Sequence, residues 1–166
     1  MRRSQTMLLN AIMTNLPDPQ TLATLVSTVT ETMCGISFEP AKEVRQIDPT
    51  SWRLAILPIN GKRKIQVLLS SDQASGLGLG AALLGFPADQ LDPSMVDDSL
   101  CELLNMAAGQ IKRALRLDDA LGLPRIVEGE AGQALFKTAR HQGTMLRSRG
   151  ELDLIIWVTE SAKDEA

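Results

Sequence analysis

The sequence feature that most constrains the fold is a hairpin signal in residues 52–70. Residues 52–59 and 64–70 are rich in Leu, Ile and Val, and Asn60-Gly61 lies between them. An Asn-Gly pair suits a tight hairpin turn because both residues tolerate positive φ. Apolar residues alternate along residues 64–70, which predicts one face on a core and one facing mostly outward. We therefore predict an antiparallel sheet.

Four further segments extend the predicted sheet. Residues 144–149 and 151–159 form a second predicted hairpin, and apolar residues on both faces of its second strand indicate a central strand or an interface. Residues 125–127 add a short strand. A strand within residues 36–47 is expected to be broken or at an edge, because Pro40 has no N–H to donate.

Apolar periodicity predicts helices around these strands. Residues 4–16 have helical spacing and stop at Pro17. A second helix follows and ends at Gly35, a residue that suits the left-handed conformation of a helix end. A short helix over residues 131–138 precedes the second hairpin.

A glycine-rich segment admits two interpretations. Residues 75–81 contain Gly-x-Gly-x-x-Ala, which after a strand can open a dinucleotide-binding fold. That fold requires a second parallel strand after the helix, and no β-rich run precedes residues 98–112. We therefore interpret residues 72–84 as a glycine-rich helix that lies close against the sheet or another helix.

Residues 98–112 predict a helix with two different faces. At about 100° per residue, its polar residues Asp98, Glu102, Asn105 and Gly109 share a sector of roughly 60°. The opposite, packing face is predicted to hold Leu100, Leu103, Leu104, Ala107, Ile111, Ala114 and Leu115. The simpler interpretation is an amphipathic helix with a solvated face.

Helix propensity favours a second interpretation of that polar face. Gly and Asn are both unfavourable in a helix interior, and Gly lowers helix stability by about 1 kcal/mol relative to Ala. A face that only had to contact solvent would therefore rarely use either residue. Gly109 has no Cβ to block another backbone, and Asn105 offers a donor and an acceptor beside it. Together, Gly109 and Asn105 predict a docking surface from which one polar side chain reaches toward the partner.

Composition excludes several classes of function. The formal net charge of −3 and the content of three Phe, two Trp and no Tyr give neither a basic nor an aromatic footprint for nucleic acid. No apolar run approaches the roughly 20 residues that span a bilayer, so we expect a cytoplasmic protein with no membrane partner.

Thiol, metal and histidine chemistry receive little support. Cys34 and Cys101 are the only cysteines and form no Cys-x-x-Cys pair, so we expect neither a disulfide framework nor a structural zinc site. His141 is the single histidine, and any Ser-His-Asp or Cys-His enzyme would have to use it. We interpret His141 as a surface residue and expect no metal or cofactor bound by this chain.

The string over residues 95–112 resembles the signature helix of the CheX-type chemotaxis phosphatases, relatives of CheC and of the FliY flagellar-switch phosphatases. Their mark is Glu-x-x-Asn followed by Gly, here Glu102, Asn105 and Gly109. The order of elements is also similar over most of residues 20–160. The resemblance implies an α+β fold of the CheC/CheX type, with a largely antiparallel sheet packed against long helices. It divides the chain into an N-terminal helical extension (1–17), a CheX-like phosphatase domain (18–160) and a charged tail (161–166).

The resemblance also implies a substrate, the aspartyl phosphate of a CheY-like response-regulator receiver domain. Asn105 would orient the water that attacks in line, and Glu102 would hold the receiver by pairing with a lysine. The receiver would bring its own Mg²⁺. From the residues themselves we add Met106 and Gly109 as contact positions, and Asp98 as a residue that either steers the partner or stabilises the start of the helix.

One expectation about assembly and two alternatives accompany this hypothesis. A single Glu-x-x-Asn helix resembles CheX, whose members are typically dimers, so a homodimer is expected. The main competitor to a phosphatase is a non-catalytic module of the same fold that binds a receiver or a flagellar-switch component. The other is an unrelated α+β domain with a chance signature.

Overall fold

The computed structural model describes residues 16–42 and 48–161. The predicted helix over residues 4–16 lies outside these ranges apart from its last residue, and the tail lies outside apart from Ser161. The elements in chain order are α2 (Pro19–Cys34), β1 (Phe38–Pro40), the 3-10 turn η1 (Pro49–Ser51), β2 (Trp52–Ile59), β3 (Ile65–Asp72), α3 (Gln73–Leu84), the 3-10 turn η2 (Ala88–Gln90), α4 (Pro93–Ala114), β4 (Arg125–Val127), α5 (Gly129–Gln142), β5 (Thr144–Ser148) and β6 (Asp153–Glu160).

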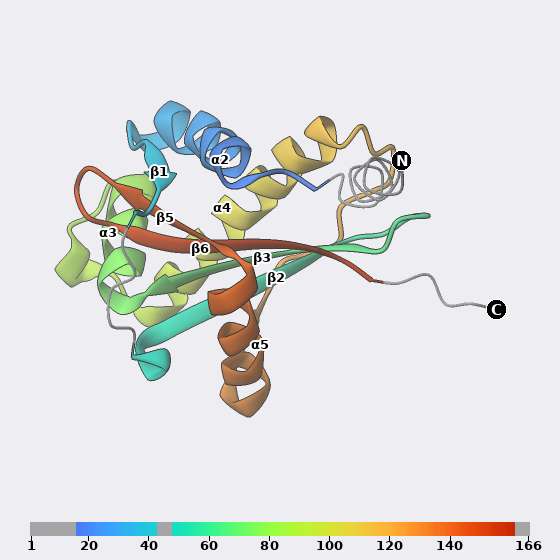
Figure 1. The fold of residues 1–166 in the computed structure, drawn as a ribbon. Coiled ribbons are helices and arrows are strands. Elements are labelled where there is room, and N and C mark those ends of the chain that lie inside the picture. The colour runs from blue at the N-terminus through green and yellow to red at the C-terminus, as the bar shows by residue number, and fades with distance from the viewer. Residues whose placement is uncertain (1–15, 43–47, 162–166) are drawn as a thin grey trace.

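The described strands form one six-stranded sheet in the order β1-β5-β6-β3-β2-β4 (Figure 1). Every pairing is antiparallel, which confirms the predicted sheet and the α+β fold class. The strands of the two predicted hairpins pair, with Ala55 opposite Leu69 in the first and Leu146 opposite Leu154 in the second. The tight turn predicted from Asn60-Gly61 was wrong, because the five residues 60–64 connect the strands and neither Asn60 nor Gly61 has positive φ. Strand β6 lies between β5 and β3, so it is the central strand that its apolar faces predicted.

Helices cover both faces of the sheet, with α2 and α4 on one side and α5 on the other (Figure 1). The larger core joins α2, α3 and α4 to the inward residues of the strands, among them Leu57, Val67 and Ile156. The smaller core lies under α5. The prediction that the second face of β3 points mostly outward was wrong for Leu68 and Ser70, which are 2% and 1% exposed, because α5 covers this face.

Helix α5 runs from Gly129 to Gln142 and is longer than the predicted segment over residues 131–138. It buries Phe136 against Trp52, with 5.3 Å between ring centroids. A Cβ on Gly132 would lie 2.3 Å from the carbonyl oxygen of Val127, so the helix start approaches the end of β4 closely. This packing depends on contacts between distant segments, which explains why local periodicity underestimated the helix.

The glycines of α3 serve close packing, as the sequence predicted. A Cβ on Gly76 would lie 3.1 Å from Cγ1 of Val96 in α4, and one on Gly78 would lie 2.7 Å from Cδ2 of Leu152. The helix begins at an N-cap, Asp72, whose carboxylate accepts a hydrogen bond from the backbone N–H of Ser75 at 2.7 Å. The glycine run therefore holds α3 against α4 and the second hairpin.

Strand β1 is an edge strand whose outer side is capped. The Ser27 hydroxyl of α2 accepts from the Phe38 backbone N–H at 2.8 Å and donates to the Phe38 carbonyl at 3.1 Å. Pro40 has no backbone N–H. The part of the predicted 36–47 strand that the structure describes is thus an edge, and the N–H and C=O groups of Phe38 on its outer side are already paired with Ser27.

Candidate functional site

Helix α4 carries every residue that the sequence assigned to the site. It begins at Pro93, five residues before the predicted segment, because Asp92 caps it by accepting from the Met95 N–H at 2.9 Å. It lies over β2 and β3 and packs against α2 and α3. Its buried face consists of Ser99, Leu100, Leu103, Leu104, Ala107, Ala108 and Ile111.

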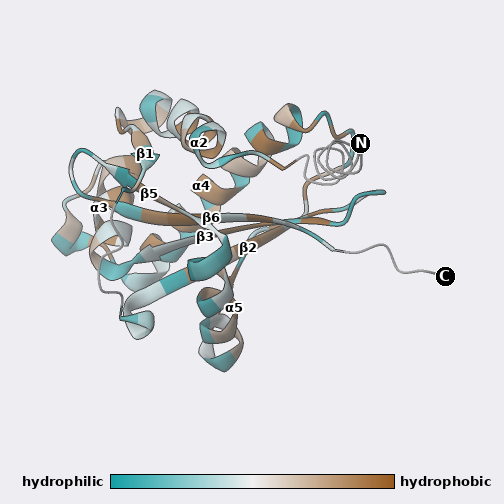
Figure 2. Ribbon diagram, viewed as in Figure 1, coloured by the Kyte–Doolittle hydropathy of each residue, from teal (hydrophilic) through white to brown (hydrophobic). Residues whose placement is uncertain are grey.

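The predicted packing face was wrong at Ala114, which is exposed. Leu115, which caps the helix, is half-buried and packs against the larger core as predicted. Periodicity alone therefore continued the buried stripe through one position that the core does not cover. Hydrophobic and hydrophilic stretches both appear along α4 in Figure 2, as expected of an amphipathic helix.

The opposite face presents the predicted polar residues. Glu102 and Asp98 are exposed, whereas Asn105 and Gly109 are half-buried. The Asn105 amide has no hydrogen-bond partner among residues 16–42 and 48–161, so its donors and acceptor are available to another molecule. A Cβ on Gly109 would meet no atom within 4 Å in the part of the chain that the structure describes. Packing against these residues therefore does not require glycine there.

Two of the proposed contact positions need adjustment. Met106 is half-buried and packs against the larger core, so only part of its side chain is available to a partner. Asp98 is the sixth residue of α4, beyond the first turn, and the capping role belongs to Asp92. Because the influence of the helix dipole falls off within the first turn, stabilising the helix start no longer explains Asp98 well.

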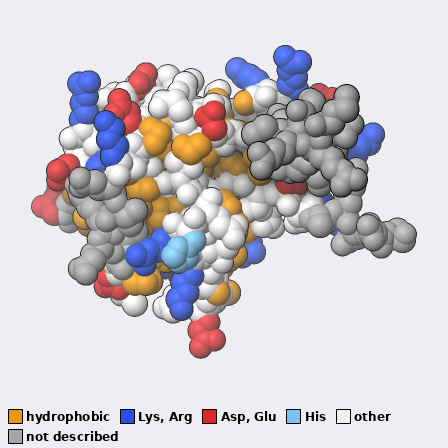
Figure 3. Space-filling model, in the orientation of Figure 1, with side chains coloured by type: hydrophobic (Ala, Val, Ile, Leu, Met, Phe, Trp, Pro, Cys, Tyr) orange, Lys and Arg blue, Asp and Glu red, His pale blue; other side chains and the backbone are white. Residues whose placement is uncertain are grey.

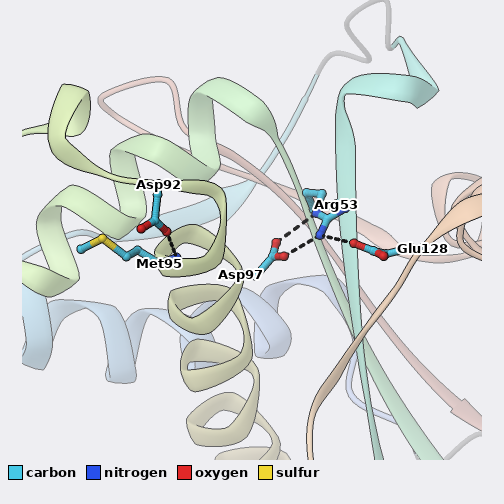
Figure 4. A network of polar contacts seen from close by, with 5 residues as sticks. All are labelled: Arg53, Asp92, Met95, Asp97 and Glu128. Atoms are coloured by element: carbon cyan, nitrogen blue, oxygen red, sulfur yellow. Dashed lines mark hydrogen bonds and ion pairs between the residues drawn. The ribbon is translucent and has the colours of Figure 1, made fainter.

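An ion-pair network that the sequence did not predict lies beside this face (Figure 4). Arg53 of β2 donates from Nε to Asp97 Oδ1 of α4 at 3.0 Å and from Nη2 to Glu128 Oε1 at 2.8 Å. These contacts raise the pKa of the Arg53 guanidinium, the hydrogen bond to Asp97 contributing most. The network ties the first half of α4 to the sheet and to the start of α5.

No sequence signal would have found this network, because Arg53 is 44 residues from Asp97 and 75 from Glu128. Its effect on the site is electrostatic as well as structural. Asp97 is compensated by Arg53, whereas Asp98 and Glu102 on the same helix have no ion-pair partner among the described residues. The uncompensated negative charge of α4 therefore lies on the predicted docking face.

Cysteine and histidine chemistry finds no support near this face. Burial raises the pKa of the Cys101 thiol, and the carboxylates of Asp97 and Asp98 raise it further. A thiol with a raised pKa forms little of the nucleophilic thiolate at neutral pH. His141 is exposed on α5, on the opposite side of the sheet.

The described residues offer no group of three or more His, Cys, Asp or Glu side chains placed to hold a metal ion. Positive and negative side chains intermingle on the face shown in Figure 3, and neither sign dominates it. No helix within the described ranges is long and apolar enough to cross a membrane.

A comparison with known protein families shows which family this chain belongs to. The family described as "Chemotaxis phosphatase CheX" matches residues 53–145, more than half of the chain. The chain belongs to the CheX family. The matched segment begins at Arg53 and includes all of α4, so Glu102 and Asn105 lie within the part that defines this membership.

Solved structures share the fold of this CheX family member at low sequence identity. A CheX–CheY–BeF3–Mg²⁺ complex from Borrelia burgdorferi is 16% identical, with 85% of this chain and 96% of that chain covered and a TM-score of 0.63. A CheX protein from Desulfovibrio desulfuricans is 15% identical, with coverages of 84% and 96% and a TM-score of 0.58. Thermotoga maritima FliY is 10% identical, with 84% of each chain covered and a TM-score of 0.51. Direct comparison with curated protein sequences gave no match.

Proposed function

We propose that this chain is a protein phosphatase that hydrolyses the aspartyl phosphate of a CheY-like receiver domain. The observation that carries the proposal is the position of the Asn105 amide on the outer face of α4, one turn from Glu102 and inside the family match. The described residues offer this amide no hydrogen-bond partner. Membership in a phosphatase family supports the activity, and the CheY present in the Borrelia burgdorferi complex supports the class of partner.

In the proposed reaction Asn105 places the attacking water. The amide oxygen accepts a hydrogen bond from the water and the amide NH₂ donates one, which fixes the water in line with the scissile bond. The water oxygen bonds to phosphorus as the bond to the receiver's carboxylate oxygen breaks, and the proton leaves with inorganic phosphate. An amide is too weak a base to take that proton at neutral pH, so Asn105 contributes orientation.

The other groups of the face bind the partner. Glu102, exposed and without an ion-pair partner among the described residues, is available to a lysine of the receiver. Asp98 adds negative charge one turn earlier. With only two carboxylates on this face, we propose that the Mg²⁺ ion is held by the receiver, where it would neutralise charge on the phosphoryl group.

The test of the proposed function is the lifetime of the phosphate on a purified receiver domain. The chain should shorten that lifetime in proportion to its concentration. Tight binding to the phosphorylated receiver with an unchanged lifetime would support the non-catalytic module instead. A panel of CheY-like receivers is needed, because these residues do not identify the cognate one.

Gly109→Ala is expected to move stability and docking in opposite directions. The added methyl group meets no atom of the described residues within 4 Å and removes a helix-interior glycine, so the free energy of unfolding should rise by about 1 kcal/mol. The same methyl group would obstruct a receiver backbone at close approach and weaken binding. Urea unfolding and titration with a receiver measure the two effects. Unchanged affinity in a stabilised variant would remove Gly109 from the docking surface.

We also propose that the chain forms a homodimer through the sheet edge at β4. The Ser27 cap closes the β1 edge, which leaves β4 as the edge available for pairing. Leu123, two residues before β4, is 85% exposed, as expected of a residue covered by a second copy. Light scattering should give the mass of two chains, and Leu123→Arg should shift it toward one. A monomeric wild-type chain would contradict the proposal.

A further inference from the structure

The outer face of α4 has an electrical polarity along its length. Asp98 and Glu102 lie in its first half, and Lys112 and Arg113 lie in its last turn. At about 100° per residue all four fall within a sector of roughly 100° that also contains Asn105. None of the four charges has an ion-pair partner among the residues that the structure describes. The face therefore presents a negative and a positive end, with the amide between them.

The helices beside α4 do not compensate these charges. Helix α3 contains no charged residue, and α2 contains only Glu31. Glu102 and Lys112 are about 15 Å apart along the helix axis, farther than the roughly 8 Å screening length at physiological salt. The two ends consequently act on a partner as separate charges.

We propose that these features fix the orientation in which the receiver docks, an inference that rests on the proposed function. A basic group of the receiver lies over Asp98 and Glu102, and an acidic surface lies over Lys112 and Arg113. The opposite orientation places like charges together at both ends. Electrostatic complementarity of this kind contributes to specificity and to the association rate.

The decisive experiment reverses the positive end with Lys112→Glu/Arg113→Glu. Its matched control is Lys137→Glu/Arg140→Glu. This pair makes the same change of charge at two exposed positions in the second half of α5, on the other side of the sheet. Binding is measured to a receiver domain loaded with beryllofluoride and Mg²⁺, so that the readout does not require hydrolysis. A neutral variant, Lys112→Gln/Arg113→Gln, is measured as well, so that the test still holds if the reversed variant does not fold.

The α4 reversal is expected to weaken binding by about tenfold or more at low ionic strength, with a smaller loss for the neutral pair and none for the α5 control. The loss should shrink as salt rises, because salt screens exposed charges. Equal affinities of the α4 and α5 reversals, or a loss that persists at high salt, would overturn the orientation. A wild-type chain that binds with these charge effects but does not hydrolyse would overturn only the proposed function.

Discussion

Asn105→Ala is expected to remove nearly all phosphatase activity and leave the fold intact. The amide has no hydrogen-bond partner among the described residues and is not part of the core, so its loss leaves no unsatisfied buried group. Alanine is also the better helix former, which favours a slightly more stable α4. Without the amide the water is no longer held in line, and the rate at saturating receiver should fall by about 10²- to 10³-fold.

The measurement is kcat for phosphate release, together with the thermal unfolding of each variant. Gln133→Ala is the matched control, because Gln133 is an exposed amide on α5, on the opposite side of the sheet. It should retain full activity. A variant at Asn105 that folds and keeps wild-type kcat would show that this amide does not place the water.

Glu102→Lys is expected to have the second largest effect, on binding. The substitution puts a cation where the account requires an anion facing a lysine, and truncation or reversal of close charge pairs at interfaces costs about 2 to 5 kcal/mol. The affinity for a beryllofluoride-loaded receiver should therefore fall by roughly 30-fold or more. Glu102→Gln, which keeps the shape but removes the charge, should fall less.

The control for Glu102 is Glu130→Lys, an equal change of charge at an exposed position in the first turn of α5. It should bind the receiver as wild type does. If Glu102→Lys also kept wild-type affinity, or lost kcat with no change in affinity, Glu102 would not be the residue that holds the receiver.

Local sequence patterns predicted most of the helices and strands. Strand β2 spans the predicted residues 52–59, and its apolar residues pair with those of β3 as the pattern predicted. Gly35 ends α2 with φ +70°, the left-handed conformation that its position predicted. Strand β4 likewise matches its predicted residues 125–127.

Local sequence patterns did not predict the packing between segments that are far apart in the chain. The cover that α5 gives to Leu68, and the contact of Arg53 with Asp97 and Glu128, join segments far apart in sequence. Periodicity also assigned Ala114 to the packing face of α4, although this residue is exposed.

The candidate site was predictable as a surface, because a helical face follows from spacing alone. Asn105 and Glu102 lie on the outer face of α4 as expected. Their roles, and those of Asp98, Met106 and Gly109, stay predictions, since chemistry at a partner's active site depends on atoms that this chain does not contain.

The most direct test of the central claim follows the phosphate on a purified receiver after its source of phosphate is removed. Wild-type chain, Asn105→Ala and Gln133→Ala are compared at equal concentration, with binding to the receiver verified for each. The account predicts rapid loss with the wild type and Gln133→Ala, and loss near the receiver's own rate with Asn105→Ala. Equal phosphate lifetimes with the wild type and with no added chain, despite binding, would contradict it.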